Sequence, residues 1–198
     1  MTVALAAACA ATPSGDGSAA VKPVYNQTTG RLEQLTSDRD GDGKIDTRAF
    51  MDGVHLKYIE LDRNNDGRPD RWEYYTAGTP GRGTLGSVFD KNTVLERAEE
   101  ANGPDQKITR REFYDHGVIQ RVEEDTDFDG RVDKWETYEN GALVRMDLDL
   151  TGSGKPNRRL VYNASGALDH MESDTKGDGH FERMAIDPAK GGRKGGGL

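Results

Sequence analysis

The chain has 198 residues, a formal net charge of -8 and 25 glycines, and 31% of its residues are charged. Leucine, isoleucine, valine and phenylalanine make up only about a sixth of it, which favours disorder and argues against one large hydrophobic core. Lysine and arginine are scattered rather than clustered, so no nucleic-acid groove or basic membrane-surface patch is indicated. The acidic excess points instead to cations.

The N-terminal segment contains Cys9, the single cysteine, so no intrachain disulfide is possible. Cys9 follows the apolar run MTVALAAA and precedes the small and polar AATPSGDGSAA. The row LAAAC resembles the lipobox of bacterial lipoproteins, in which the cysteine is lipidated and becomes the mature N-terminus. The resemblance implies a partial signal at 1–9, a lipid anchor at Cys9, a flexible tether at 10–21 and a place in the bacterial cell envelope, periplasmic or surface-facing. The alternative is an unstructured alanine-rich leader.

The remainder of the chain repeats with a period of about 24 residues. Asp38 and Asp62 are 24 residues apart, and so are Asp125 and Asp149. Each unit has an acidic loop, a short segment that ends in an aromatic or apolar residue, a turn, and a return segment. Tandem units of this kind bury apolar surface against their neighbours, so a weakly hydrophobic chain can become ordered.

The repeats define the extent of one domain. We expect it to cover 22–187, with a glycine-rich insertion at 76–88 that projects as a flexible loop, and a flexible glycine-rich tail at 188–198.

The segments between the acidic loops favour strands. Asn140-Gly141 lies between two apolar-rich runs and is a strong signal for a tight hairpin turn. Aromatic and β-branched residues in segments such as KWETY also favour strands. One helical turn is the alternative for the return segments, because Leu143 and Met146 are three residues apart. The predicted fold is all-β: tandem antiparallel β-hairpin repeats linked by calcium-binding loops, in an elongated meander or solenoid-like array.

Stacked hairpins place equivalent residues beside one another, so the apolar positions should form the core. The alternative for the aromatic positions is a carbohydrate-stacking surface. The expected columns are Tyr25, Tyr75, Tyr114, Tyr138 and Tyr162, and Leu32, Leu56, Ile119, Leu143 and Leu168.

The acidic loops predict calcium sites. In DTDFDGRVDKWE, oxygen ligands fall at positions 1, 3, 5, 9 and 12 (Asp125, Asp127, Asp129, Asp133 and Glu136), with glycine at position 6. Calcium takes six to eight oxygen ligands, and the glycine permits the sharp turn that wraps the loop around the ion. The loop resembles the DxDxDG loops of EF-hand, dockerin and thrombospondin type 3 repeats. The resemblance implies that this chain shares their metal chemistry, but not their helices or their partners.

Two more loops share this pattern and a further one keeps part of it. The alternative is that Asp and Gly simply form turns, but four carboxylates within nine residues repel one another unless a cation is present. The loop that starts at Asp149 and the loop that contains Asp105 retain little charge. The remaining expected ligands are Asp38, Asp40, Asp42 and Asp46; Asp62, Asn64, Asp66, Asp70 and Glu73; and, more weakly, Asp174, Asp178 and Glu182.

No catalytic motif is found. The four histidines share no pattern, the serines lack a GxSxG context, and the aspartates are explained as ligands. We therefore expect a calcium-stabilised, lipid-anchored repeat scaffold that presents a surface to a protein or glycan partner, and not an enzyme. The alternatives are a calcium-responsive adaptor or sensor and a glycan-binding module.

Overall fold

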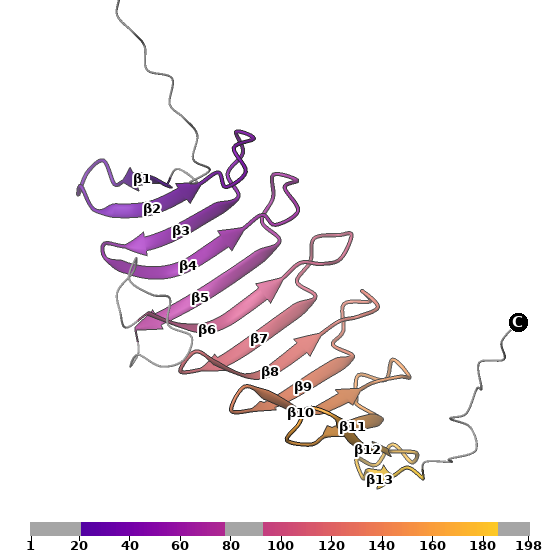
Figure 1. The fold of residues 1–198 in the computed structure, drawn as a ribbon. Helices are drawn as coiled ribbons and strands as arrows, with labels where there is room; N and C mark the ends of the chain where they lie inside the picture. The colour runs from indigo at the N-terminus through magenta and orange to yellow at the C-terminus, as the bar shows by residue number, and fades with distance from the viewer. Residues whose placement is uncertain (1–20, 78–92, 186–198) are drawn as a thin grey trace, which may run out of the picture.

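A computed structural model describes residues 21–77 and 93–185 (Figure 1). These residues form strands and no helix, so within them no helix is long and apolar enough to cross a membrane. The expected lipid anchor at Cys9 and the glycine-rich tail lie outside the described residues. The strands are β1 (Val21–Tyr25), β2 (Leu32–Ser37), β3 (Thr47–Asp52), β4 (His55–Leu61), β5 (Arg71–Ala77), β6 (Thr93–Glu100), β7 (Arg110–Asp115), β8 (Val118–Glu124), β9 (Lys134–Glu139), β10 (Ala142–Leu148), β11 (Arg158–Tyr162), β12 (Leu168–Ser173) and β13 (Glu182–Arg183).

The 13 strands pair antiparallel in chain order and make one open sheet. The all-β hairpin meander is therefore confirmed. β5 continues through Ala77, so the first residues of the expected insertion belong to a strand, and its continuation at 78–88 lies outside the described residues.

Short turns and long acidic loops alternate along the chain. Figure 1 shows the long loops side by side along one margin of the sheet, which places the candidate ligands of successive units next to one another. The first five long loops are nine residues each: 38–46, 62–70, 101–109, 125–133 and 149–157.

Asn140 and Gly141 form the turn between β9 and β10, as the sequence predicts. Their φ angles are 52° and 81°, the left-handed conformation that a two-residue hairpin turn of the favoured type requires at both central positions. The turn from β7 to β8 repeats this geometry at His116 and Gly117.

Each of the first six hairpins contains a β-bulge. In the hairpin of β9 and β10, Tyr138 pairs with Leu143 and Thr137 with Arg145, which leaves Val144 as an extra residue. The bulge brings Leu143 and Met146, three residues apart, to the same face of a strand. The three-residue spacing that also suits a helix therefore has a β explanation. The extra residues are Glu33, Lys57, Glu96, Gln120, Val144 and Asp169.

The two faces of the sheet differ in burial. The inner face contains Ala98 and Val122, which are 0% and 1% exposed, and a small apolar cluster with Ala49 and Ile59. The outer face carries Phe50, whose ring stacks on Tyr58 at 4.2 Å between centroids, and both tryptophans. A single layer of strands thus replaces a conventional two-layer core.

The expected tyrosine and leucine columns occupy one row, because a return strand separates each pair of equivalent strands. Tyr25 pairs with Leu32, and Tyr162 pairs with Leu168. Equivalent residues are thus two strands apart, or about 10 Å. Tyr75 is 9% exposed in the middle of the sheet, whereas Tyr25 and Leu168 are 51% and 47% exposed near its ends. The row contributes to the core only in the middle of the array.

Candidate metal sites

Each acidic loop is held together by a hydrogen bond to its first aspartate. Asp125 is 8% exposed, and its Oδ2 accepts the backbone N–H of Gly130 at 2.8 Å. Gly130 has a φ of 93°, which side chains rarely adopt, so the glycine at position 6 is explained. The same bond joins Gly43 to Asp38, Gly67 to Asp62, Gly154 to Asp149 and Gly179 to Asp174.

The ninth residue closes the loop from the other end. Asp133 accepts the backbone N–H of Thr126 at 3.1 Å, and Asp46 accepts that of Arg39 at 2.5 Å. These bonds are the ones that turn-forming aspartates make. Loop shape alone therefore does not distinguish a metal site from a turn, and convergence of carboxylates and unused acceptors must decide.

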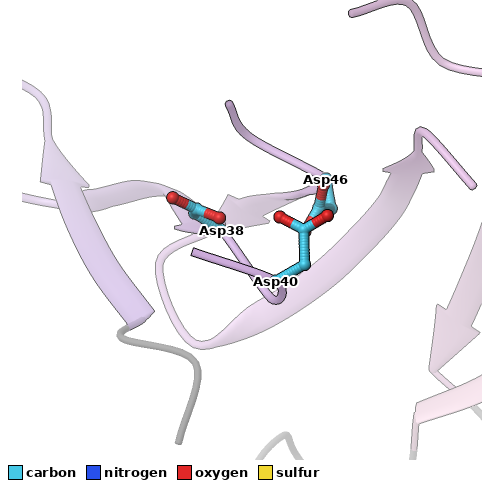
Figure 2. Close-up of side chains that lie close together, drawn as sticks. All are labelled: Asp38, Asp40 and Asp46. Carbon is cyan, nitrogen blue, oxygen red and sulfur yellow. The ribbon is translucent and has the colours of Figure 1, made fainter. Parts of the chain in front are cut away.

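Two loops bring three carboxylates together. In the first loop, Asp38, Asp40 and Asp46 (Figure 2) each offer one oxygen, and these oxygens lie within 4.8 Å of one another. The second cluster consists of the residues at the same three positions of the loop 125–133, which are Asp125, Asp127 and Asp133. Calcium lies 2.3–2.6 Å from its ligand oxygens, so ligands of one ion are separated by at most about 5 Å. One cation can therefore reach all three oxygens in either cluster.

The second cluster, Asp125, Asp127 and Asp133, contains an unsatisfied buried acceptor. Asp125 Oδ1 is buried and has no hydrogen-bond partner. In the first loop the corresponding oxygen of Asp38 accepts the N–H of Gly41 at 2.7 Å. A buried carboxylate oxygen without a partner is costly, and a bound cation would satisfy it.

The fifth-position aspartates lie outside both clusters. Asp42 Oδ1 accepts the N–H of Lys44 at 2.8 Å, and Asp129 Oδ1 accepts that of Arg131 at 2.8 Å. The backbone amide of Lys44, with the Asn65 side chain, holds the pKa of Asp42 below its ordinary value. The Asp42 carboxylate therefore remains ionised close to the first cluster.

The glutamates expected at position 12 lie on the sheet. Glu136 is 2.8 Å from Lys134 Nζ and accepts the hydroxyl of Tyr138 at 2.6 Å. Glu73 contacts Arg71 at 2.8 Å and accepts the hydroxyl of Tyr75. The structure does not bring either glutamate into a loop cluster, because β9 and β5 begin immediately after position 9 and direct these side chains to the inner face.

The loop 62–70 has a cation of its own. Arg63 Nε lies 2.6 Å from Asp70 Oδ1, and its Nη1 lies 2.8 Å from Glu100. Asp62 accepts the N–H groups of Asp66 and Gly67, and Asn64 stands at position 3. Its expected ligands form no cluster of three carboxylates in the described part of the chain.

In the loops that start at Asp149 and Asp174, the carboxylates already have neutral hydrogen-bond donors or a lysine as partners. Thr151 donates its backbone N–H and its hydroxyl to Asp149. Burial opposes ionisation of Asp149, but these and other hydrogen bonds outweigh burial and lower its pKa to about 2. In the last loop, Lys176 Nζ lies 3.2 Å from Glu182 Oε1, and four backbone amides donate to Asp174. The single weak site expected from Asp174, Asp178 and Glu182 thus contains an internal cation.

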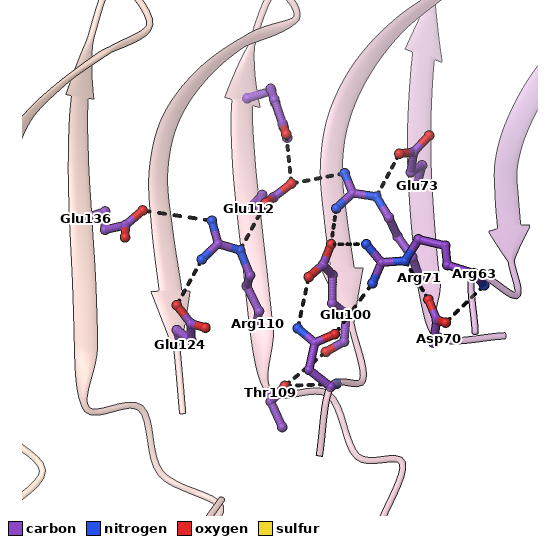
Figure 3. Close-up of polar contacts among 12 residues, drawn as sticks. Arg63, Asp70, Arg71, Glu73, Glu100, Thr109, Arg110, Glu112, Glu124 and Glu136 are labelled. Carbon is purple, nitrogen blue, oxygen red and sulfur yellow. Dashed lines mark hydrogen bonds and ion pairs between the residues drawn. The ribbon is translucent and has the colours of Figure 1, made fainter. Parts of the chain in front are cut away.

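A ladder of ion pairs on the inner face is a feature that the sequence analysis missed (Figure 3). Arg71 contacts Glu73, Glu100 and Glu112, the last at 3.0 Å. Arg110 lies 3.0 Å from Glu112 and contacts two further glutamates on β8 and β9. A recurring pattern of a basic residue followed two positions later by glutamate, as in Arg71 and Glu73, was a signal that could have revealed the ladder.

Tyrosine hydroxyls complete the ladder. Tyr114 donates to Glu112 at 2.8 Å, and burial together with this bond raises the pKa of Tyr114 to about 12. Burial would raise the pKa of Glu112, but hydrogen bonds from Tyr114 and Arg110 and the charge of Arg71 outweigh it and lower that pKa. The tyrosines of the middle hairpins therefore have structural partners on the inner face.

No protein-family model and no curated protein matches the chain. Among solved structures, the crystal structure of TarM has a TM-score of 0.38 and 13% sequence identity over 61% of this chain. The match spans 21% of the TarM chain. This weak likeness carries no argument about the fold or the function of this chain.

Proposed function

We propose that the chain is a calcium-binding repeat scaffold in which two ions rigidify the loop margin of the sheet. The first ion is held by the cluster of Asp38, Asp40 and Asp46, and the second by the cluster around Asp125. The scaffold is lipid-anchored through Cys9 at the bacterial envelope and presents its sheet to a partner. The anchor and the location rest on the sequence alone.

The unsatisfied Asp125 Oδ1 is the observation that carries the proposal. It is the one first-position acceptor, among the five loops that begin with aspartate in the described ranges, for which no partner is found. A turn-forming aspartate has no need of two converging carboxylates, those of Asp127 and Asp133, beside its own. A cation explains both features.

Calcium fits the donor set better than softer metals. Both clusters contain only carboxylates, without histidine or cysteine, and hard cations prefer such oxygen ligands. Three carboxylates leave room for backbone carbonyls and water, which calcium accepts in its larger coordination shell. Magnesium demands stricter octahedral geometry and should bind more weakly.

Isothermal titration of the full chain with calcium tests this proposal. We expect two ions per chain rather than three, because Arg63 already neutralises Asp70. Asp127→Asn should abolish one site, and Asp40→Asn the other. Asparagine retains the Oδ1 acceptor that each aspartate uses for an N–H two residues later and removes the charge; in Asp40→Asn it also replaces the Oδ2 that accepts from Asn65.

Asp105→Asn is the matched control. Asp105 also accepts an N–H two residues later, at 3.1 Å from Lys107, but belongs to no carboxylate cluster. Both sites should survive in this variant. Failure of the parent chain to bind calcium, or retention of two sites in the double variant Asp40→Asn/Asp127→Asn, would contradict the proposal.

The measured affinities also separate a scaffold from a sensor. Extracellular structural modules function with dissociation constants as weak as about 10⁻⁴–10⁻³ M, whereas intracellular sensors lie near 10⁻⁷–10⁻⁵ M. We expect the weak range. Affinities in the sensor range would instead favour the calcium-responsive adaptor.

A glycan-binding module is the second candidate function, and a groove on the outer face supports it. Trp72 and Trp135 occupy equivalent positions in one row across β5 to β9. Trp135 lines a groove of 410 Å³ together with Arg121, Arg145 and Asp147. An aromatic side chain bordered by charged donors and acceptors suits a neutral sugar, which has an apolar face and many hydroxyls.

Neutral oligosaccharides titrated against the full chain test this candidate. Trp135→Ala should weaken binding at least tenfold while leaving the calcium titration and thermal midpoint unchanged. Trp72→Ala, four strands away, should preserve binding in the groove. An absence of glycan binding by the parent chain would reject the glycan function and leave the calcium proposal intact.

A further inference from the structure

One side chain of the second loop reaches the carboxylates of the first loop. Asn65 Nδ2 donates to Asp40 Oδ2 at 3.0 Å and to Asp42 Oδ2 at 3.0 Å. In the opposite direction, Lys44 Nζ of the first loop donates to the backbone oxygen of Asn65 at 2.9 Å. Neighbouring repeats are therefore joined at the first carboxylate cluster, Asp38, Asp40 and Asp46.

Asn65 occupies a left-handed position that three other loops fill with glycine and the loop 125–133 fills with Phe128, at a φ of 63°. It is the fourth residue of its loop and has a φ of 60°. The fourth residues of three other loops, Gly41, Gly152 and Gly177, are glycines with φ between 68° and 76°. Asparagine tolerates this left-handed conformation better than most residues, so it supplies a polar group there at modest strain.

The amide oxygen of Asn65 has no hydrogen-bond partner, although the atom is buried. It belongs to the same planar amide whose nitrogen is 3.0 Å from both carboxylates. A half-turn of the amide exchanges the two ends: the oxygen loses no hydrogen bond, whereas the nitrogen gives up both of its bonds to the carboxylates, so the exchange is favourable only when a bound cation takes over these carboxylates. Beside a cation, the oxygen is the end of an asparagine that serves as a ligand.

We propose that Asn65 Oδ1 is a ligand of the ion held by Asp38, Asp40 and Asp46. The first site then spans two repeats, and the ion ties the loop between β2 and β3 to the loop between β4 and β5. The inference rests on the proposed calcium function. The site at Asp125 has no such counterpart, because the fourth position of the next loop is Gly152.

Calcium titration in the Asp127→Asn chain, which retains only the first site, tests the inference. Asn65→Gly removes the side chain and suits the positive φ, so a loss of affinity reports the missing ligand rather than backbone strain. We expect at least a tenfold loss. Asn65→Asp supplies a carboxylate oxygen at the same place and should keep or tighten binding.

The outcomes separate the two proposals. Affinity unchanged or increased in Asn65→Gly would overturn the ligand role and leave the calcium function standing, since Asn65 would then only donate hydrogen bonds to the ion-free carboxylates. A tenfold loss in Asn65→Asp would also overturn it. No calcium binding by the parent chain would overturn both proposals.

Discussion

Removal of calcium from the full chain is expected to lower its thermal unfolding midpoint by on the order of 10 °C. A ligand that binds only the folded state stabilises it by about 2.7 kcal/mol at one hundred times its dissociation constant, so two sites contribute about 5 kcal/mol. Without the ions, the clustered carboxylates repel one another and Asp125 Oδ1 lacks a partner. Calorimetric scans in saturating calcium and in chelator measure the difference.

The double variant Asp40→Asn/Asp127→Asn is the control. Its midpoint should not respond to calcium, and it should exceed that of the chelated parent because the repulsion is reduced. Saturation with magnesium should give a smaller increase in the parent. A parent midpoint that does not change between calcium and chelator would show that the turns are stable by hydrogen bonding alone.

The fold was predictable because its signals are local and recur. The Asn140-Gly141 turn and the repeat period specify hairpins, and the glycine at position 6 specifies the loop that joins them. The bulge was not predictable from one unit, since Leu143 and Met146 at a spacing of three suit a helical turn equally well. Pairing with the neighbouring strand resolves the ambiguity, and a single segment carries no information about that pairing.

The loops were predictable as acidic turns, but the number of converging sites was not. Spacing alone gives Asp62 and Asp125 the same role, yet the second residue of one loop is Arg63, which contacts Asp70, and that of the other is Thr126. Glu136 fits a ligand position by counting, although the start of β9 turns it towards Lys134. Such differences depend on side-chain direction, which a spacing rule does not contain.

Arg71→Ala is expected to destabilise the chain by about 3–5 kcal/mol, measured by urea unfolding in saturating calcium. The Arg71 side chain is 14% exposed and contacts three glutamates: Glu73, Glu100 and Glu112. Its loss removes the cation that these three carboxylates share, leaving Glu100 to Arg63 alone and Glu112 to Arg110 alone, and the single-layer sheet has little apolar core to compensate. Replacing the arginine by Met and all three glutamates by Gln should recover most of the loss, because no buried charge is then left unpaired.

Arg121→Ala is the control, because Arg121 pairs with Glu123 on the outer face, stacks on the Phe113 ring at 3.7 Å and is 51% exposed. An exposed pair contributes about 0–1 kcal/mol, so this variant should remain close to the parent.

Acid provides a second test of Arg71. Hydrogen bonds from Asn102 and Arg71 outweigh burial and lower the pKa of Glu100, and the pKa of Glu112 is lowered as well. A lowered folded-state pKa contributes stability above the unfolded value of about 4.3, and this stability is lost as the pH falls through the folded-state pKa. With chelator present throughout, the urea midpoint of Arg71→Ala should therefore fall less on acidification than that of the parent. Equal acid sensitivity in the two chains, or a loss at neutral pH no larger than that of Arg121→Ala, would show that the ladder of ion pairs does not stabilise the sheet.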